Sequence, residues 1–330
     1  MSSSPETSNH ATTREALLKA STPPSKHLFS TLITANHILH HHNVVDAYGH
    51  ISVRNPQNPN TFFMSKSLAP ALISSRADIE EYHVSDASPV NPNAPKGYQE
   101  RFIHSEIYKR YSDVHSVVHA HNEAVLPFSI GSVPLKPVYH MAGVIGTHVP
   151  VFEISNHYKP SDHLHSFLVN NEHLGAGLAA GFHPTTSQFA KVGGLIKNYI
   201  TAAASSPPAE PAFPPCPVVL MRGHGFTNVG ATIEDAVFRA IFTCKNAQIQ
   251  ATSLLMQSTF NLGAIARQFG AKQESTEQAP QEGIKFLSER EAGDSWTQMQ
   301  GTVERPWGLW CEEVRSVGLY RNEVRDGSES

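Results

Sequence analysis

Apolar positions begin to follow a regular period near residue 27. The segment 1–24 is rich in Ser, Thr, Pro and His, and we predict that it is disordered because it cannot bury enough apolar surface to offset chain entropy. From Leu28 to Leu39 apolar residues recur at the spacing of a helix. Alternating apolar residues around Ile51, followed by the run 61–64, then predict a β-hairpin across a loop with two prolines.

The same criteria predict further helices and strands up to about residue 259. Strands are expected over 114–121, 149–154 and 218–221, and helices over 100–110, 123–130, parts of 173–201, and 233 to about 259. Thr232 followed by Asp235 resembles a capping box at the start of the last helix. The Pro- and Ala-rich stretch 205–217 reads as a surface insertion.

The last sixty residues read as an addition to this domain. Residues 271–283 form a predicted polar linker, and Ser288 with Glu291 predicts the cap of a further helix. Three tryptophans follow, and they need covering either by helix packing or by a subunit contact: Trp296, Trp307 and Trp310. We therefore divide the chain into a disordered segment 1–24, a folded domain 25–270, and a linker with a helical extension 271–330.

Composition narrows the class of partner. With 25 Lys and Arg against 29 Asp and Glu, the net charge is -4, and there is no basic stripe for nucleic acid. We expect a small neutral or anionic molecule instead. The three cysteines are scattered, which argues against a disulfide framework or a thiolate metal site. No secretory leader or membrane span is visible, so we expect a cytoplasmic protein with no membrane partner.

Three histidines carry the clearest chemical signal. His119 and His121 end a β-branched run, and His224 follows another apolar run within Met221-Arg222-Gly223-His224-Gly225. Residues i and i+2 of a strand share one face, so two imidazoles can meet one metal ion while the third arrives from another strand. Three protein ligands leave a coordination position open, which is typical of catalytic sites. With 20 histidines in the chain, a chance His-x-His is the alternative.

Four ordered motifs resemble the class II aldolase/adducin family. They are Gly49-His50-Ile51-Ser52-Val53-Arg54, Tyr98-Gln99-Glu100-Arg101-Phe102-Ile103-His104, Val117-Val118-His119-Ala120-His121, and Arg222-Gly223-His224-Gly225. The likeness covers about residues 28–256. It implies an α/β fold, a three-layer α/β/α sandwich with a mainly antiparallel central sheet. It also implies a homotetramer with active sites at subunit boundaries, so that residues 25–270 form a metal-binding catalytic domain.

The resemblance also implies a ligand set and a chemistry. His119, His121 and His224 would hold a divalent metal ion, and Glu100 would be both a ligand and the acid/base carboxylate. Zinc suits three imidazoles and a carboxylate best, although manganese, iron or cobalt fit the same donors. Such an ion stabilises the negative charge left when a carbon–carbon bond breaks.

Departures from the sugar-aldolase pattern argue against a phosphorylated substrate. His50 and the stretch Ser65-Lys66-Ser67-Leu68-Ala69 replace the small residues that cradle a phosphate in those enzymes. His50, Arg54 and Lys66 could meet a carboxylate instead, and a structural role is the alternative for Arg54. This pattern resembles the branch with decarboxylases of hydroxylated aromatic carboxylates, and there Tyr139 would be a candidate acid.

Three functions stay open at this point. The first is a metal-dependent decarboxylase of a non-phosphorylated hydroxy-carboxylate. The second is an aldolase that cleaves a carbonyl compound at the same metal. The third is a non-catalytic, adducin-like interaction module, which the retention of three histidines and Glu100 disfavours.

Overall fold

A seven-stranded sheet organises the molecule. The computed structural model describes residues 26–183, 211–270 and 283–326. The strands are β1 (His50–Arg54), β2 (Thr61–Ser65), β3 (Ile79–His83), β4 (Ser116–Ala120), β5 (Val151–Phe152), β6 (Val218–Met221) and β7 (Gly225–Gly230). Their order is β3-β2-β1-β4-β7-β6-β5. All neighbouring pairs are antiparallel except β5 and β6, so the predicted, mainly antiparallel sheet is confirmed.

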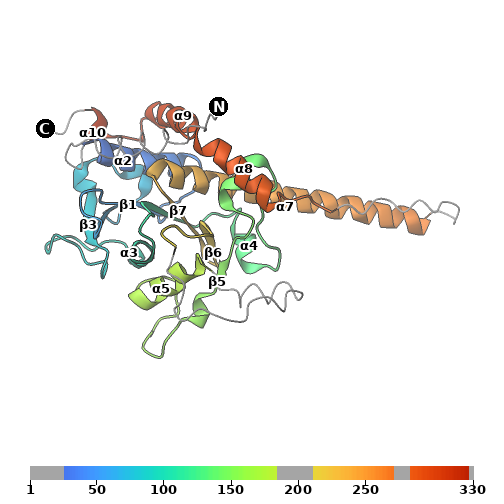
Figure 1. The fold of residues 1–330 in the computed structure, drawn as a ribbon, viewed down its shortest axis with the longest axis horizontal. Coiled ribbons are helices and arrows are strands. Elements are labelled where there is room, and N and C mark those ends of the chain that lie inside the picture. The colour runs from blue at the N-terminus through green and yellow to red at the C-terminus, as the bar shows by residue number, and fades with distance from the viewer. Residues whose placement is uncertain (1–25, 184–210, 271–282, 327–330) are drawn as a thin grey trace, which may run out of the picture.

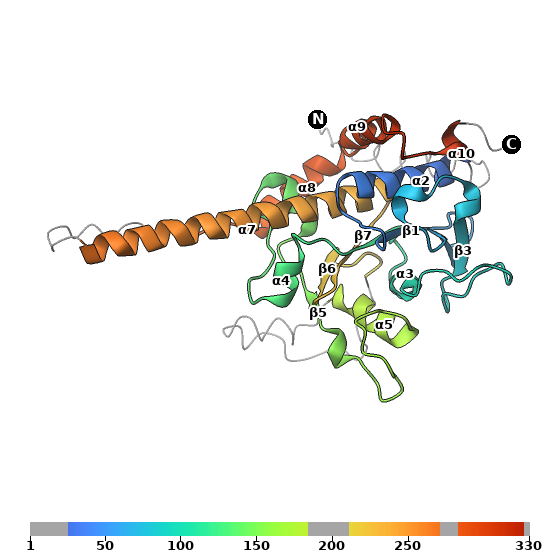
Figure 2. The same cartoon turned by 180° about the vertical axis from the view of Figure 1, so that it is seen from behind.

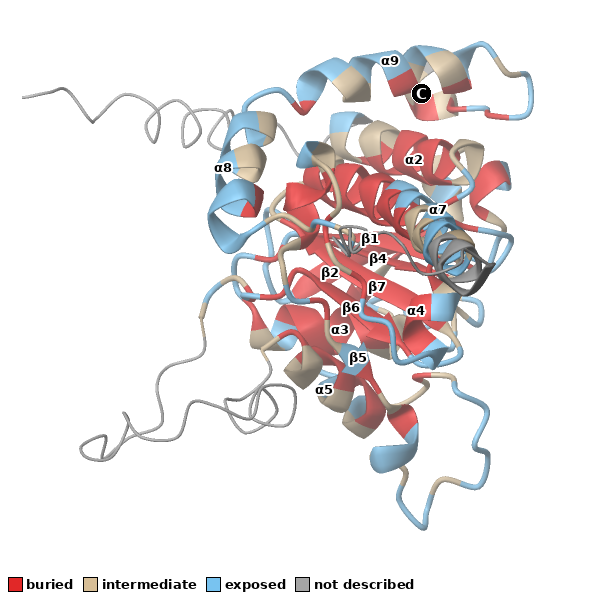
Figure 3. Ribbon diagram, turned by 90° about the vertical axis from the view of Figure 1, so that its right-hand side faces the viewer, coloured by how far each residue is buried: buried red, intermediate tan, exposed pale blue. Residues whose placement is uncertain are grey.

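Helices cover both faces of this sheet. α2 (Lys26–His41) and α7 (Ile233–Gly270) pack on one face, and α3 (Arg101–Arg110) and α5 (Glu172–Gly181) lie on the other (Figure 3). The short helices are α4 (Leu126–Ile130), η1 (Pro70–Leu72), η2 (Arg76–Asp78), η3 (His140–Ile145) and η4 (Ile154–Asn156). The three-layer α/β/α sandwich is thus confirmed.

Each central strand contributes to two cores. Val118 of β4 belongs to the cluster under α2 and α7, while its neighbour Val117 belongs to the cluster under α3 and α5. Phe63 and Phe62 of β2 divide in the same way. Because successive side chains point to opposite faces and helices cover both, the strands read as continuous apolar runs.

A glycine permits the close approach of α3 and α5. A Cβ atom on Gly175 would lie 2.6 Å from the carbonyl oxygen of Phe102. No larger residue fits there without moving one helix. Gly175 is therefore a helix-contact residue.

α7 is longer than its sequence pattern indicates. Thr232 accepts a hydrogen bond from the Asp235 amide at 3.1 Å, which confirms the predicted start. The end predicted near Thr259 is wrong, because the helix continues to Gly270 and projects from the body of the molecule (Figures 1 and 2). Its apolar stripe fades there, and Leu255 and Met256 are exposed.

The chain after residue 282 folds back over α2 and α7. It contains α8 (Glu289–Gln300), α9 (Glu304–Arg315) and α10 (Glu323–Asp326), and α8 has the predicted Ser288 capping box. Trp310 is buried against Phe238, and Trp296 and Trp307 pack on the same core. Helix packing within the chain therefore buries Trp310 and partly covers Trp296 and Trp307.

Other sequence predictions had mixed outcomes. The first helix, the hairpin and the helix after Glu100 are confirmed. The helix predicted over 123–130 begins later, at Leu126, and β3 and β7 were not foreseen. Four predictions lie wholly or partly outside the described residues: the disorder of 1–24, residues 205–210 of the insertion 205–217, residues 184–201 of the segment 173–201, and the linker 271–283 up to residue 282. Within the described part of the chain, none of the helices has the length and apolar character to cross a bilayer.

Candidate metal centre and active site

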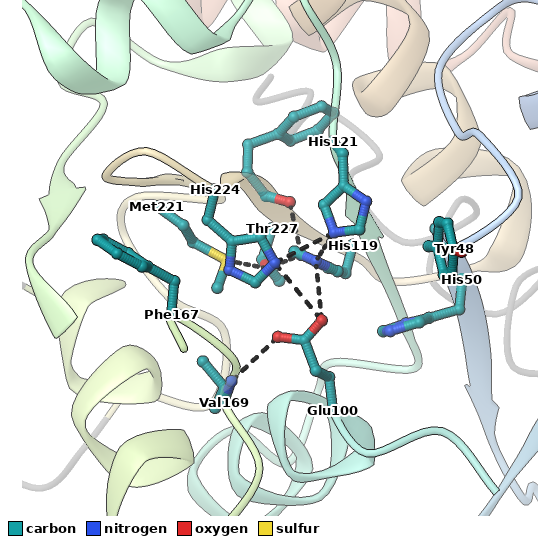
Figure 4. A network of polar contacts seen from close by, with 12 residues as sticks. Tyr48, His50, Glu100, His119, His121, Phe167, Val169, Met221, His224 and Thr227 are labelled. Atoms are coloured by element: carbon teal, nitrogen blue, oxygen red, sulfur yellow. Dashed lines mark hydrogen bonds and ion pairs between the residues drawn. The ribbon is translucent and has the colours of Figure 1, made fainter. Parts of the chain in front are cut away.

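Four side chains from three regions converge at one end of the sheet. His119 lies on β4, and His121 follows that strand directly. His224 lies in the turn between β6 and β7, and Glu100 occupies the N-cap position of α3. One potential ligand atom from each residue lies within 4.8 Å of the other three (Figure 4). The structure thus brings together all four residues of the predicted ligand set.

The imidazoles face one another through the same type of atom. His119 Nε2 and His121 Nε2 are 3.0 Å apart, and His121 Nε2 and His224 Nε2 are 3.1 Å apart. Glu100 Oε2 lies 3.6 Å from His119 Nε2 and 3.5 Å from His224 Nε2. Three nitrogens and one carboxylate oxygen therefore surround a common point.

The hydrogen-bond partners of Nδ1 in His119 and His121 indicate which nitrogen of each ring carries the proton. His119 Nδ1 lies 3.1 Å from the carbonyl oxygen of Phe226, which can only accept, so this nitrogen carries the proton. His121 Nδ1 lies 3.5 Å from the Asp46 carboxylate, which favours the same tautomer. In these neutral tautomers both Nε2 atoms present lone pairs to each other and to Glu100. Such a cluster repels itself unless a cation lies within it, so these residues fit a divalent metal ion.

His224 reaches this cluster because the start of β7 lies very close to the end of β4. A Cβ atom on Gly225 would lie 2.0 Å from the carbonyl oxygen of Ala120, and Gly225 has φ of 155°. Only glycine allows β7 to start so close to the end of β4. The glycine after His224 therefore has a geometric reason, which the sequence motif alone did not reveal.

Glu100 is held as a carboxylate. Burial opposes its charge, but protonated imidazoles at His119 and His224 and the amide of Val169 outweigh this and lower the pKa of Glu100 to about 2. A bound cation would supply the same positive charge where these imidazoles are neutral. The Val169 amide donates to Glu100 Oε1 at 3.0 Å, which leaves Oε2 toward the imidazoles. Glu100 is therefore ionised near neutral pH.

A cavity of about 800 Å³ opens beside these four residues. Its wall combines aromatic rings, backbone and a few polar groups: Ala47, Tyr48, His50, Ser67, Leu68, Ala69, Lys96, Gly97, Tyr98, Gln99, Glu100, His121, Ser166, Phe167, Leu168, Gly223 and His224. Tyr48 and Phe167 stand at opposite sides of the ligand cluster in Figure 4. A pocket of this size and lining accommodates a small ring with polar substituents.

Phe167 adopts a strained backbone conformation at this cavity. Its φ is 65°, in the left-handed region that a bulky residue rarely enters. The Tyr158 hydroxyl accepts from the Phe167 amide at 3.0 Å, and Val169, two residues on, is bound to Glu100. Such strain persists where surrounding contacts over-determine the conformation, which is frequent at ligand sites.

His50 lies where the sequence placed it. It is directly opposite His119 in the β1–β4 pairing, and the two ring centroids are 5.1 Å apart. Cross-strand partners of this kind share one face of a sheet. The ring lines the cavity and points toward Glu100 in Figure 4.

Arg54 lies outside the cavity. Its guanidinium donates to the backbone carbonyl oxygens of Val114, Pro59, Tyr108 and Tyr111 at 2.7–3.0 Å. This is the structural alternative for Arg54: it ties β1 to the end of α3 and does not line the substrate cavity.

Lys66 and Tyr139 also lie away from the four-residue cluster. Lys66 lines a separate pocket of about 500 Å³ with Arg76 and Glu80, and Lys96 is the lysine that lines the cavity. Tyr139 packs against the core under α7, where burial raises the pKa of its hydroxyl to about 12. Within one chain neither side chain reaches the site, and any role of Tyr139 would require a neighbouring subunit.

Sequence reasoning missed three residues of this region. Asp46 orients His121, Phe167 forms part of the wall, and His104 contacts His50. Asp46 is the only one with a local signal, because its carboxylate accepts from the Tyr48 and Gly49 amides of a turn at 2.8 and 2.9 Å.

Comparison with known proteins identifies the family of the chain. The family model "Class II Aldolase and Adducin N-terminal domain" matches residues 30–251. The chain belongs to the class II aldolase/adducin family. Solved structures similar to this family member include an L-fuculose 1-phosphate aldolase from Glaciozyma antarctica (TM-score 0.55, 15% identity, 93% of this chain and 98% of that chain). An aldolase II superfamily protein from Pseudomonas syringae is similar (TM-score 0.57, 16% identity, 92% and 98%). At this identity they show the fold.

Sequence relatives are more specific. The chain is 45% identical over 292 residues to the decarboxylase tropJ of Talaromyces stipitatus, covering 88% of this chain and 96% of that protein. It is 28% identical over 153 residues to a 3,4-dihydroxyphthalate decarboxylase of Arthrobacter keyseri, covering 46% and 47%. The resemblance to the decarboxylase branch is therefore confirmed, and this class II aldolase/adducin protein is an enzyme, a lyase.

Proposed function

We propose that this enzyme is a metal-dependent decarboxylase of a non-phosphorylated, hydroxylated aromatic carboxylate. The observation that carries the proposal is the convergence of three imidazole nitrogens and one carboxylate beside a cavity with aromatic walls. Two relatives that are named decarboxylases support the reaction class, and one of them is named for a dihydroxylated aromatic dicarboxylate.

His119, His121, His224 and Glu100 would hold the ion. When bound, a divalent ion supplies Lewis-acid stabilisation for negative charge that develops on substrate oxygen. We propose zinc, because imidazole and carboxylate suit it, while manganese, iron and cobalt share this donor set.

The chain's own side chains would bind and orient the ring. Tyr48, Tyr98 and Phe167 offer flat apolar surfaces, and His50 offers a ring nitrogen from the cavity wall. Lys96, rather than the predicted Lys66, is placed to attract a second carboxylate at the mouth. Glu100, ionised and fixed by Val169, would accept a proton from a substrate hydroxyl.

The cavity wall argues against a phosphorylated sugar. Leu68 and Ala69 line it where the sugar aldolases have a small, hydroxyl-rich turn, and the Leu68 carbonyl accepts from the Tyr98 hydroxyl. Of residues 67–69, which line the wall there, only Ser67 has a side-chain hydrogen-bond donor for a phosphate group. An aldolase reaction on an unphosphorylated carbonyl compound remains the second candidate, because the solved structures that share the fold include an aldolase.

Product analysis tests the proposal. Purified protein loaded with zinc should release carbon dioxide from one or more members of a panel of ortho-hydroxylated aromatic mono- and dicarboxylates. Release of an aldehyde from a hydroxy-carbonyl panel, with no carbon dioxide from the acids, would favour the aldolase. Mass measurement of the same sample tests the proposed tetramer, and with it the possibility that Tyr139 acts across a subunit boundary.

A further inference from the structure

A buried hydrogen-bond chain runs from α3 to the cavity. It joins Tyr108 to Ser52, Ser52 to His104, and His104 to His50, through distances of 2.7, 2.6 and 2.8 Å. All four side chains are almost fully buried. Three of them take no part in the proposed ligand set or in the proposed chemistry, so their purpose needs a separate explanation.

The fold aligns this chain by two periodicities. His50 and Ser52 are two residues apart on β1 and share the face toward α3, while His104 and Tyr108 are four residues apart on one side of α3. Pairing of β1 with β4 then places His50 beside His119. The His50 end of the hydrogen-bond chain is therefore part of the cavity wall, and the Tyr108 end is buried in the core.

The number of protons on each group sets the direction of the hydrogen bonds. The Tyr108 hydroxyl has one hydrogen and two acceptors near it, Ser52 Oγ at 2.7 Å and the His115 carbonyl oxygen at 3.5 Å. The shorter contact is a normal hydrogen bond, and the longer one is at the limit of any interaction. Tyr108 therefore donates to Ser52.

The remaining steps follow by exclusion. Ser52 has a single hydrogen, which must go to His104 Nδ1, so a neutral His104 carries its own proton on Nε2. This proton points at His50 Nδ1. A neutral His50 then carries its proton on Nε2, the nitrogen away from His104.

His104 is neutral near pH 7. Burial lowers the pKa of His104 to about 3, and the His104 Nε2–H that points at His50 Nδ1 requires this His50 nitrogen to be unprotonated. The reverse direction of the chain would need the Tyr108 hydrogen to point at the His115 carbonyl, 3.5 Å away, and would leave the 2.7 Å contact to the Ser52 hydrogen alone.

We propose that His104 is a positioning residue: through the chain from Tyr108 and Ser52 it fixes His50 as an N–H donor toward the cavity, and this donor selects a substrate with a carboxylate oxygen at that place. The inference rests on the proposed function for the identity of the ligand. It adds that His50 donates a hydrogen bond to the substrate carboxylate and that His104 fixes the tautomer needed for this. An imidazole with its lone pair toward the cavity would repel the same carboxylate.

A pair of ligands that differ by one carboxylate tests the selection. Catechol and 2,3-dihydroxybenzoate share adjacent hydroxyls, and only the second has a carboxylate. Calorimetry with the zinc-loaded protein should show a preference for 2,3-dihydroxybenzoate of about tenfold or more, as expected for a hydrogen bond to a charged group. His104→Phe and His50→Phe should each reduce this ratio about tenfold, and the double variant should reduce it no further.

His37→Phe is the matched control. His37 is equally buried and has one hydrogen bond of 2.7 Å, to the Ile73 carbonyl oxygen, on the other side of the sheet. This variant should keep the parent preference and the parent zinc content. A His104→Phe protein with the full preference overturns the proposal.

A spectroscopic readout covers the case in which the variants do not fold. In zinc-loaded protein with ¹⁵N-labelled histidine, the His50 ring should carry its proton on Nε2 and have an unprotonated Nδ1. A proton on Nδ1 overturns the inference whatever the reaction. Conversely, a sample that releases no carbon dioxide contradicts the proposed function and leaves the His50 tautomer and the ligand preference unaffected.

Discussion

Two groups of histidines in this molecule have opposite arrangements. Beside α2 and the C-terminal helices, each imidazole has its own partner: His37 bonds the Ile73 carbonyl, His40 the Tyr320 hydroxyl and His42 the Glu313 carboxylate. At the end of the sheet, His119, His121 and His224 point their Nε2 atoms at one another. Satisfied imidazoles hold helices together, whereas converging lone pairs require a cation.

Removal of one histidine from each group should give the largest difference. His119→Ala should abolish stoichiometric metal binding and lower turnover by about 10³-fold or more, because the remaining donors cannot hold the ion and its charge stabilisation is lost. His40→Ala should change neither value. Elemental analysis and product assays measure both, and a His119→Ala protein with full metal content would refute the ligand assignment.

Glu100 separates proton transfer from metal binding. Glu100→Gln preserves the shape of the side chain and a possible oxygen ligand, so the protein should retain metal. Turnover should fall by about 10²- to 10⁴-fold, because an amide cannot accept the proton. Steady-state rates beside metal content provide the measurement; an unchanged rate would show that Glu100 has only a structural role.

His37, one of the histidines with its own hydrogen-bond partner, should make the free energy of unfolding depend on pH. Burial lowers the pKa of His37 to about 4, against 6.5 for an unperturbed histidine. Between these values the unfolded chain binds a proton that the folded chain excludes, so stability falls as pH decreases from about 6.5 to about 4. The loss amounts to at most about 3 kcal/mol over this window.

His37→Phe should remove this contribution. Denaturant unfolding of parent and variant at several pH values measures it, and the variant should have a shallower slope below about pH 6.5. Equal slopes for the two proteins would mean that His37 titrates normally in the folded state.

The smallest effect is expected at the edge of the satisfied group. The contact between His42 and Glu313 is 3.0 Å long and partly exposed. Glu313→Gln should cost at most about 1 kcal/mol of unfolding free energy, as is typical of such pairs, and leave metal content unchanged. Thermal unfolding of the two proteins is sufficient to measure it, and a loss of several kcal/mol would show that this contact anchors the C-terminal helices.

The sequence alone could predict that His119, His121 and His224 lie together. His119 and His121 share a face because they are two residues apart, and the turn glycines around His224 mark a strand end. The role of Glu100 required the resemblance to a family. The four family motifs also implied the fold class. The apolar periodicity of the sequence agrees with it, because it predicts short strands between amphipathic helices.

The remaining details depend on tertiary packing that no local pattern encodes. The contact of His50 with His104 arises from the orientation of β1 on α3, which the chain does not express as spacing. Lys66 follows a strand whose last residue, Ser65, is buried, and it turns into a neighbouring pocket. Phe167 reaches the cavity by a backbone conformation that its residue type disfavours.

X-ray absorption spectroscopy at the metal edge of the purified protein tests the central claim most directly. The account predicts one divalent ion per chain, with three imidazole nitrogens and carboxylate or water oxygen in its first coordination shell. A protein that binds no zinc, manganese, iron or cobalt, or an ion without imidazole ligands, would contradict it.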